Sequence, residues 1–347
     1  MGGGDEQHRS RTKGAATSSG GADDADAPHR AARSGRHRPA APLVRVALPE
    51  WYRELVEPSL NGTNATWYAD GKSGLQALGK ADAFWHELWG PGQPQLPELL
   101  DAGADLRWMH VSSAGVEWVD LDLVRRRRVR LTNGAGLHAP PIAEHVVMCL
   151  LAAQRGLLPL LRAQSEHRWE RHFGGRRELA GAKVLILGHG LIGQAVGRKA
   201  KALGAEVTGV RRRGPGNWRD LLPQSDFLVV AAPLTPATRG IVGARELKAL
   251  KPGAWVVNIA RGPLIDEPAL LKALDGHLGG AALDVFDQEP LPEDHPLWTK
   301  PNVLLTPHIS ASTDHMRERA AALFLDNLRR FESGKRLRNL VNFKAGY

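Results

Sequence analysis

The chain has 347 residues, of which 42% are hydrophobic and 24% charged, with a formal net charge of +9. This is the composition of a globular protein long enough for two domains of ordinary size. It contains no apolar run of about 18 residues, so no transmembrane helix is expected, and its single cysteine, Cys149, excludes an internal disulfide. One cysteine suits a reducing compartment, and we predict a cytoplasmic location.

The N-terminal segment differs from the rest of the chain. Residues 1–42 hold seven Arg or Lys and five acids, with no Leu, Ile, Val or aromatic residue. Such a segment cannot bury enough apolar surface to offset the entropy of ordering, so residues 1–41 are predicted to be a disordered leader. It lacks the apolar core of a secretory signal. An interaction tail is the alternative.

Short apolar runs then alternate with helical patterns. Strand-like runs are predicted at residues 42–49, 106–113, 129–133, 183–188, 206–210, 226–233, 254–260, 279–286 and 302–307. Helices are predicted at residues 140–161, 191–203, 218–222, 244–250, 267–275 and 312–334. This alternation predicts an α/β protein with a doubly wound parallel sheet, Rossmann-like in its second half.

A glycine motif follows the strand predicted at 183–188. Gly188, Gly190 and Gly193 are spaced as G-x-G-x-x-G between a strand and a helix, which is the context that dinucleotide binding needs. The first glycine makes the tight turn, the second lets backbone approach a pyrophosphate, and the third lets helix pack on strand. An ordinary glycine-rich turn is the alternative.

Three later strands end in polar residues. Arg261, Glu289 and His308 each follow one of them, at the sheet edge where open α/β sheets bind ligands. Arg261 would hold the carboxylate of a 2-keto acid with its planar fork. His308 would give the carbonyl oxygen its proton, and Glu289 would orient the imidazole. Each of these residues alone is more typical of a solvated surface or loop position. The three together, downstream of a dinucleotide-binding turn, predict reduction of a 2-keto acid.

From about residue 42 onward the sequence resembles the D-isomer-specific 2-hydroxyacid dehydrogenase family. The resemblance rests on residues 188–193, on "PLTPATRGIV" and "NIARGPLIDEPAL", and on "ALDVFDQEPL" and "TPHISAST". It implies a catalytic trio of Arg261, Glu289 and His308, with Asp284 at the nicotinamide end. It also implies a dinucleotide-binding domain over residues 138–309. A smaller, flavodoxin-like substrate domain would combine residues 42–137 and 310–347, with the active site in the cleft between them.

The same resemblance assigns the remaining site residues. The substrate carboxylate is expected on the backbone of Ser113, Ala114 and Gly115, beside Arg261 and His308. Further cofactor contacts are assigned to Leu191, Ile192, Pro233, Thr238 and Ala260. Family members are typically homodimers joined partly through a helix such as that at 141–161, so we expect a homodimer here.

Three arginines stand where the NAD-using members carry an acid. Arg211 occupies the end of the second strand of the nucleotide fold, and Arg212 and Arg213 follow it. Arg211 and Arg212 are expected to bind the 2′-phosphate of NADP, whereas Arg213 reads as solvated. The sequence therefore predicts that NADPH is preferred to NADH, with NAD as a lesser cofactor.

Four further features of the sequence have two readings or a structural expectation. Trp169 and Arg171 are candidates for the active site or the dimer contact, with plain packing of Trp169 as the alternative. The arginines of residues 123–131 are expected on a solvated strand or loop edge, with an anion patch as the alternative. Cys149 is expected in the core. We expect no metal, nucleic-acid or membrane partner.

Two function hypotheses are kept. The first is a reductase for a small 2-keto acid such as glyoxylate or hydroxypyruvate, although phosphoglycerate, formate and phosphite dehydrogenases share the same motifs. The second is a dinucleotide-sensing, corepressor-like protein on the same fold. The chain shows no sign of the extra C-terminal regulatory domain of some serine-pathway members.

Overall fold

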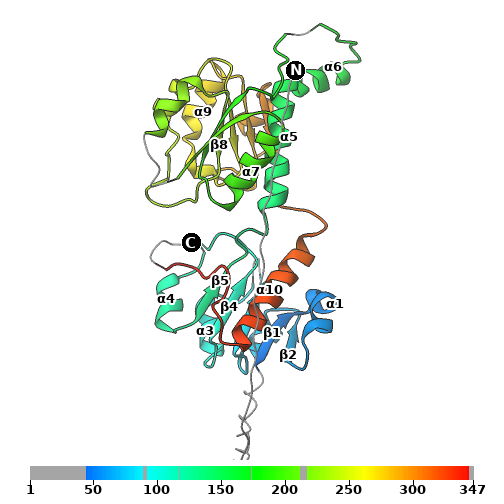
Figure 1. The fold of residues 1–347 in the computed structure, drawn as a ribbon, viewed down its shortest axis with the longest axis vertical. Coiled ribbons are helices and arrows are strands. Elements are labelled where there is room, and N and C mark those ends of the chain that lie inside the picture. The colour runs from blue at the N-terminus through cyan, green and yellow to red at the C-terminus, as the bar shows by residue number, and fades with distance from the viewer. Residues whose placement is uncertain (1–43, 89–91, 117, 173, 212–216, 344–347) are drawn as a thin grey trace, which may run out of the picture. The chain divides into compact units, whose positions relative to one another are not determined.

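The fold is built on two parallel β-sheets (Figure 1). The structure is a computed structural model that describes residues 44–88, 92–116, 118–172, 174–211 and 217–343, so the predicted leader lies outside the described residues. Sheet A has the strand order β2-β1-β3-β4-β5, and sheet B has the order β11-β10-β9-β8-β6-β7. Both contain only parallel pairs, with helices on their faces, which confirms the predicted α/β class.

The strands of sheet A are short and their order places β1 next to β3. This 2-1-3-4-5 order is that of flavodoxin-like folds, as expected for the smaller domain. Its strands are β1 (Arg45–Pro49), β2 (Asn64–Tyr68), β3 (Ala83–His86), β4 (Trp108–Val111) and β5 (Arg130–Thr132).

In sheet B the order of strand addition reverses at β6, because β7 lies on one side of it and β8 on the other. That is the topological switch point at which nucleotides bind in open sheets. Its strands are β6 (Lys183–Leu187), β7 (Glu206–Val210), β8 (Phe227–Val230), β9 (Trp255–Asn258), β10 (Gly280–Leu283) and β11 (Val303–Leu305).

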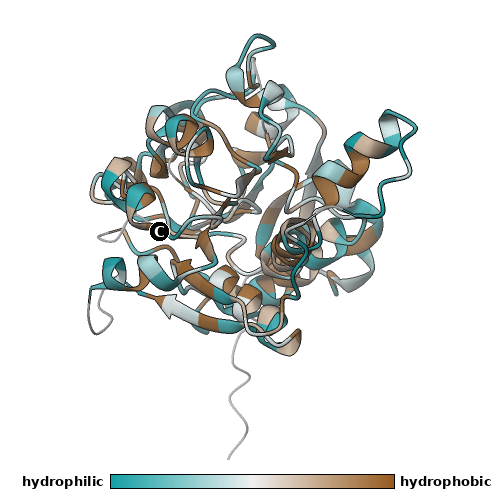
Figure 2. Ribbon diagram, turned by 90° about the horizontal axis from the view of Figure 1, so that it is seen from above, coloured by the Kyte–Doolittle hydropathy of each residue, from teal (hydrophilic) through white to brown (hydrophobic). Residues whose placement is uncertain are grey.

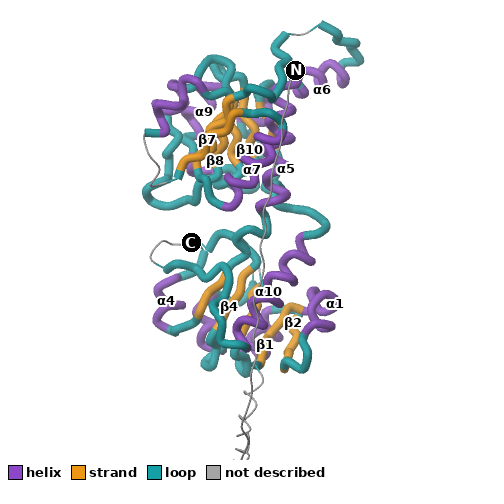
Figure 3. Tube along the Cα trace, viewed as in Figure 1, coloured by secondary structure: helices purple, strands orange, loops and turns teal. Residues whose placement is uncertain are grey.

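Helices surround both sheets (Figure 3). They are α1 (Arg53–Val56), α2 (Gly71–Leu78), α3 (Leu96–Ala102), α4 (Leu121–Arg126), α5 (Ala139–Arg155), α6 (Leu157–Ser165), α7 (Leu191–Ala202), α8 (Ala244–Ala249), α9 (Glu267–Leu274) and α10 (Met316–Glu332). A 3₁₀ segment, Trp218–Gln224, stands where a helix was predicted at 218–222.

Successive residues of sheet A pack on opposite faces. Val46 and Leu48 of β1 contact the α10 side, where Phe324 stacks on Trp85 (4.5 Å between ring centroids) and on Trp108 (5.2 Å). Ala47 faces the other layer, which is formed by α2, α3 and α4. The period of two in each strand therefore builds two apolar layers.

Sheet B repeats this arrangement. Val184 and Ile186 of β6 pack with α5 and α7, whereas Leu185 and Leu187 pack with the layer that includes α8 and α9. Burying both faces explains why the central strands are continuous apolar runs in the sequence. Figure 2 shows the hydrophobic residues gathered along the strands and on the helix faces turned toward them.

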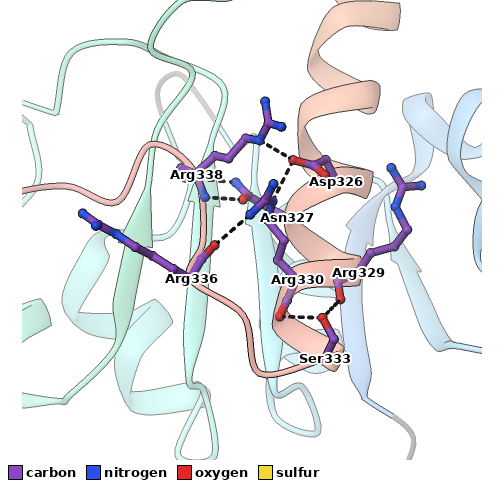
Figure 4. Close-up of polar contacts among 7 residues, drawn as sticks. All are labelled: Asp326, Asn327, Arg329, Arg330, Ser333, Arg336 and Arg338. Atoms are coloured by element: carbon purple, nitrogen blue, oxygen red, sulfur yellow. Dashed lines mark hydrogen bonds and ion pairs between the residues drawn. The ribbon is translucent and has the colours of Figure 1, made fainter. Parts of the chain in front are cut away.

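The C-terminal residues are attached to sheet A by α10 and by β5. Arg330 and Arg338 both bind the same oxygen of Asp326, at 2.9 and 2.7 Å, and Asn327 exchanges hydrogen bonds with the backbone of Arg338 (Figure 4). Leu340 then pairs antiparallel with Thr132 of β5. Residues from both ends of the described chain thus complete this layer.

The predicted helix at 140–161 is two helices. Gly156 has φ +65°, the left-handed conformation of a C-cap, and α5 and α6 meet there at an angle of 71°. Because the apolar pattern continues across the glycine, the sequence pattern alone did not indicate the break. Within the described residues no single helix is long and apolar enough to span a membrane, and the bent pair α5–α6 passes that test only when its two parts are joined.

The arginines of residues 123–131 lie on a solvated edge, as expected, because Arg125 to Arg128 are exposed and Arg130 lies in β5, an edge strand of sheet A. Arg125 and Arg126 end α4, where cations suit the helix dipole, and Arg128 makes the turn into β5 with φ +56°. Trp169 is 89% exposed, so it does not pack against the residues that the structure describes. Cys149 is buried, as predicted, and burial together with the charge of Asp284 raises the pKa of its thiol to about 12.

Candidate active site

The glycine turn lies between β6 and α7 at the switch point. A Cβ on Gly188, which has φ +101°, would stand 2.5 Å from the backbone of Ala231, and one on Gly193 would stand 2.1 Å from the carbonyl oxygen of Gly188. Gly190 has open space where a Cβ would be, at the N-cap of α7. The turn therefore fits a dinucleotide: its backbone is open to a pyrophosphate, and the first amides of α7 have no acceptor within the helix.

Arg211 follows β7 at the mouth of this turn. Its Nε donates to the carbonyl oxygen of His189 at 3.0 Å, and its side chain is exposed. Burial, and then the charges of Arg211 and Lys201, lower the pKa of His189. Positive charge therefore gathers at the end of β7. Arg212 and Arg213 lie outside the described residues.

Glu289 and His308 form a hydrogen-bonded pair. His308 Nδ1 lies 2.7 Å from Glu289 Oε2, and Glu289 Oε1 accepts from the amide of Phe286 at 2.9 Å. Because the carboxylate accepts, Nδ1 carries the proton and Nε2 remains for a substrate. His308 has φ +53°, an uncommon conformation for a residue other than glycine, and its side chain is half exposed.

Asp284 positions the loop that carries His308. Its carboxylate is buried and accepts from Thr306 Oγ1 at 2.6 Å and from the amides of Ile309 and Ser310 at 3.0 Å each. Three donors on one carboxylate fix the loop on both sides of the imidazole. A contact between Asp284 and the nicotinamide stays a prediction.

Arg261 stands at the end of β9. Asn258 is buried, donates to the carbonyl oxygen of Arg261 at 2.9 Å, and accepts from the amide of Ala260 at 3.1 Å. A Cβ on Gly262 would lie 2.0 Å from the backbone of Phe286, so only glycine lets this turn approach the loop that leads to Glu289. Arg261, Glu289 and His308 thus follow three neighbouring strands, β9, β10 and β11.

The predicted substrate loop follows β4 in sheet A. Asn133 Nδ2 donates to the carbonyl oxygen of Ala114 at 2.7 Å, and the amide of Gly134 donates to the carbonyl oxygen of Ser113 at 2.9 Å. Ser113 Oγ donates to the carbonyl oxygen of Gly115 at 2.8 Å. Within the described part of the chain, the amides of Ala114 and Gly115 have no acceptor, so this loop presents free donors.

The other predicted cofactor residues lie on the loops after the strands of sheet B. Thr238 Oγ1 donates to the carbonyl oxygen of Pro233 at 2.7 Å and closes the turn after β8. Ala260 follows β9, and Leu191 and Ile192 open α7, where Leu191 is 55% exposed.

Sequence reasoning missed several positioning residues. Asn133, Asn258 and Thr306 each hold a loop through a side chain, and no role was assigned to them, although Asn258 and Thr306 begin two of the stretches that carry the family resemblance. The available signal was their place, since each lies at or just after the end of a predicted strand. Polar side chains at such positions are buried and hydrogen-bonded more often than a hydropathy pattern indicates.

Comparison with known proteins agrees with this geometry. Residues 147–310 match the model described as "D-isomer specific 2-hydroxyacid dehydrogenase, NAD binding domain". The glyoxylate reductase of Thermococcus gammatolerans is 36% identical over 265 residues, which cover 71% of this chain and 79% of that protein. The chain belongs to the D-isomer-specific 2-hydroxyacid dehydrogenase family.

Other members of the family differ in length and in name. The D-3-phosphoglycerate dehydrogenase of Methanocaldococcus jannaschii is 31% identical over 71% of this chain, and the match spans about half (49%) of that protein. A crystal structure of a D-isomer-specific 2-hydroxyacid dehydrogenase from Xanthobacter autotrophicus Py2, in complex with NADPH and MES, has a TM-score of 0.72 and 28% identity. The match covers 88% of this chain and 100% of the chain in that structure.

Proposed function

We propose that the chain is an NADPH-preferring 2-keto acid reductase that forms a D-2-hydroxy acid, with glyoxylate or hydroxypyruvate as the substrate. The observation that carries the proposal is the pair of Glu289 and His308, 2.7 Å apart, on the same sheet as the glycine turn. Arg261 at the end of the neighbouring strand supplies the cation that a keto-acid carboxylate needs.

The residues divide the reaction between them. Bound NADPH supplies the hydride for the carbonyl carbon. His308 Nε2 gives its proton to the carbonyl oxygen, and Glu289 stabilises the imidazole in the orientation and charge that this transfer needs. Arg261 binds the carboxylate and polarises the carbonyl, and the amides of Ala114 and Gly115 hold the carboxylate from the substrate loop. In the reverse direction His308 takes the proton back.

Arg211 supports the preference for NADPH. A guanidinium at the end of β7 attracts a 2′-phosphate, whereas an acid at that position would repel it. The structure from Xanthobacter autotrophicus Py2 contains NADPH. We assign the dinucleotide to residues 138–309 and the substrate loop to a domain of residues 42–137 and 310–347.

An exposed apolar face supports a homodimer. Met148 and Leu151 of α5 and Leu157, Leu160 and Leu161 of α6 are between 36% and 48% exposed. Neighbouring exposed apolar residues on two successive helices are typical of a protein interface. We propose that a second copy covers this face, and the single cysteine supports a cytoplasmic location.

The test is a matrix of kcat/KM for NADPH and NADH against glyoxylate, hydroxypyruvate, pyruvate and phenylpyruvate. We expect NADPH oxidation with the small acids and weaker use of NADH. Absence of turnover over the whole panel, with NADPH still bound in a fluorescence titration, would instead support the dinucleotide-sensing, corepressor-like alternative.

A further inference from the structure

Ser112, which precedes the substrate loop, is held from two sides. Trp85 Nε1 donates to its Oγ at 3.0 Å, and His138 Nε2 lies 3.1 Å from its carbonyl oxygen. Gly134 passes so close that a Cβ there would stand 1.9 Å from the same oxygen. His138 therefore has a fixed position directly beside the residues proposed to bind the substrate carboxylate.

His138 offers a hydrogen-bond acceptor that no described residue uses. Its Nε2 must donate, because its partner is a carbonyl oxygen, so Nδ1 of the neutral ring is an acceptor. Burial, and then repulsion by Arg319, lower the pKa of His138 and favour this neutral form. Nδ1 is buried and has no hydrogen-bond partner in the described chain.

Arg319 offers a hydrogen-bond donor that is likewise buried and unpaired among the described residues. Its Nη2 donates to Thr313 Oγ1 at 2.6 Å, while its Nε is buried and meets no acceptor among the described residues. Leu137 and Ala320, the chain neighbours of His138 and Arg319, belong to the same buried apolar cluster, and the guanidinium acts on the charge of His138. Two neighbouring side chains thus present one buried acceptor and one buried donor, both unsatisfied. Such groups usually have a partner, which can be a ligand.

We propose that His138 and Arg319 bind the C3 hydroxyl of the substrate, which makes the chain selective for 3-hydroxy-2-keto acids. A hydroxyl donates one hydrogen bond and accepts others, so it matches an acceptor beside a donor, whereas a methyl group matches neither. In hydroxypyruvate this hydroxyl is two bonds from the carbonyl carbon and three bonds from the carbon of the carboxylate, which the adjacent loop binds. The inference rests on the proposed reductase function and specifies its substrate.

The test compares hydroxypyruvate with pyruvate, which differs by this hydroxyl alone, at saturating NADPH. A site that hydrogen-bonds a substrate hydroxyl strongly rejects the analogue without it. We expect kcat/KM for hydroxypyruvate to exceed that for pyruvate by at least about a hundredfold. A ratio below about threefold, with both acids reduced, overturns the hydroxyl site and leaves the reductase function standing. Failure of both acids and of glyoxylate contradicts the reductase function itself.

Two variants of His138 separate its two nitrogens. His138→Gln keeps an amide near the position of Nε2 for the Ser112 carbonyl but removes the acceptor at Nδ1, so the hydroxypyruvate-to-pyruvate ratio should fall at least tenfold. His138→Asn places an oxygen near the position of Nδ1 and should retain most of the ratio. A purely structural role would lower kcat/KM for both acids together and leave their ratio unchanged in both variants.

Arg319→Met should lower the same ratio, because it removes the donor. Arg329→Met is the matched control, since Arg329 is an exposed arginine further along α10 that is not part of the site (Figure 4). An unchanged ratio in both His138→Gln and Arg319→Met shows that water, not substrate, uses these atoms, and refutes the proposal.

Discussion

The carboxyl edges of sheet A and sheet B offer different chemistry. On sheet B, charged side chains at the ends of β9, β10 and β11 form the proposed catalytic group. On sheet A, the loop after β4 offers mainly backbone amides, which Asn133 and Gly134 hold in place. Side chains that move protons must be particular residue types, whereas a carboxylate can be held by any well-placed amide. The comparison predicts large losses from changes on sheet B and modest ones on sheet A.

The largest effect is expected at His308. His308→Ala should lower kcat by about 10²- to 10⁴-fold, because a general acid acts mainly in the transition state. NADPH affinity, measured by fluorescence titration, should remain nearly native. Near-native turnover in this variant would show that His308 does not supply the proton.

A smaller but still large loss is expected at Arg261. Arg261→Lys keeps the charge but cannot form the bidentate fork, so kcat/KM for the keto acid should fall about a hundredfold. Steady-state kinetics over a range of keto-acid concentrations measures this. An unchanged kcat/KM would mean that Arg261 does not bind the substrate carboxylate.

Arg211 tests the cofactor side of sheet B. Arg211→Asp replaces attraction of the 2′-phosphate by repulsion, so the NADPH-to-NADH ratio of kcat/KM should fall at least about tenfold. KM for the keto acid should change little. Equal use of both cofactors by the native protein would contradict the assignment before any variant is made.

The smallest effect is expected on sheet A. Asn133→Ala removes the hydrogen bond to the carbonyl oxygen of Ala114, and loss of one such bond should raise KM for the keto acid about fivefold. kcat and NADPH affinity should change less. A loss as large as that of Arg261→Lys would show that sheet A contributes as much to catalysis as sheet B does.

The sequence predicted sheet B better than sheet A. All six strands of sheet B were expected, and the central ones, β6, β8, β9 and β10, are mainly buried apolar runs that stand out in the sequence. In sheet A, β2 and β3 were missed. β2 is an edge strand with alternating exposed residues. β3 is buried, but in the sequence its apolar run of Ala83, Phe84 and Trp85 lies between Asp82 and His86 and is too short to indicate a strand.

Local sequence patterns therefore determine the elements and the candidate residues, whereas tertiary contacts determine which of those residues meet. The sequence by itself determined the family, the glycine turn and the candidate trio, because turns and strand ends need particular residue types at fixed spacings. Only the tertiary structure decided which polar atoms meet. It brought Glu289 and His308 together across two strands and left His138 and Arg319, which come from distant parts of the chain, as neighbours with unsatisfied atoms. Hydropathy patterns record burial, but a hydrogen bond depends on positions that only the folded backbone sets.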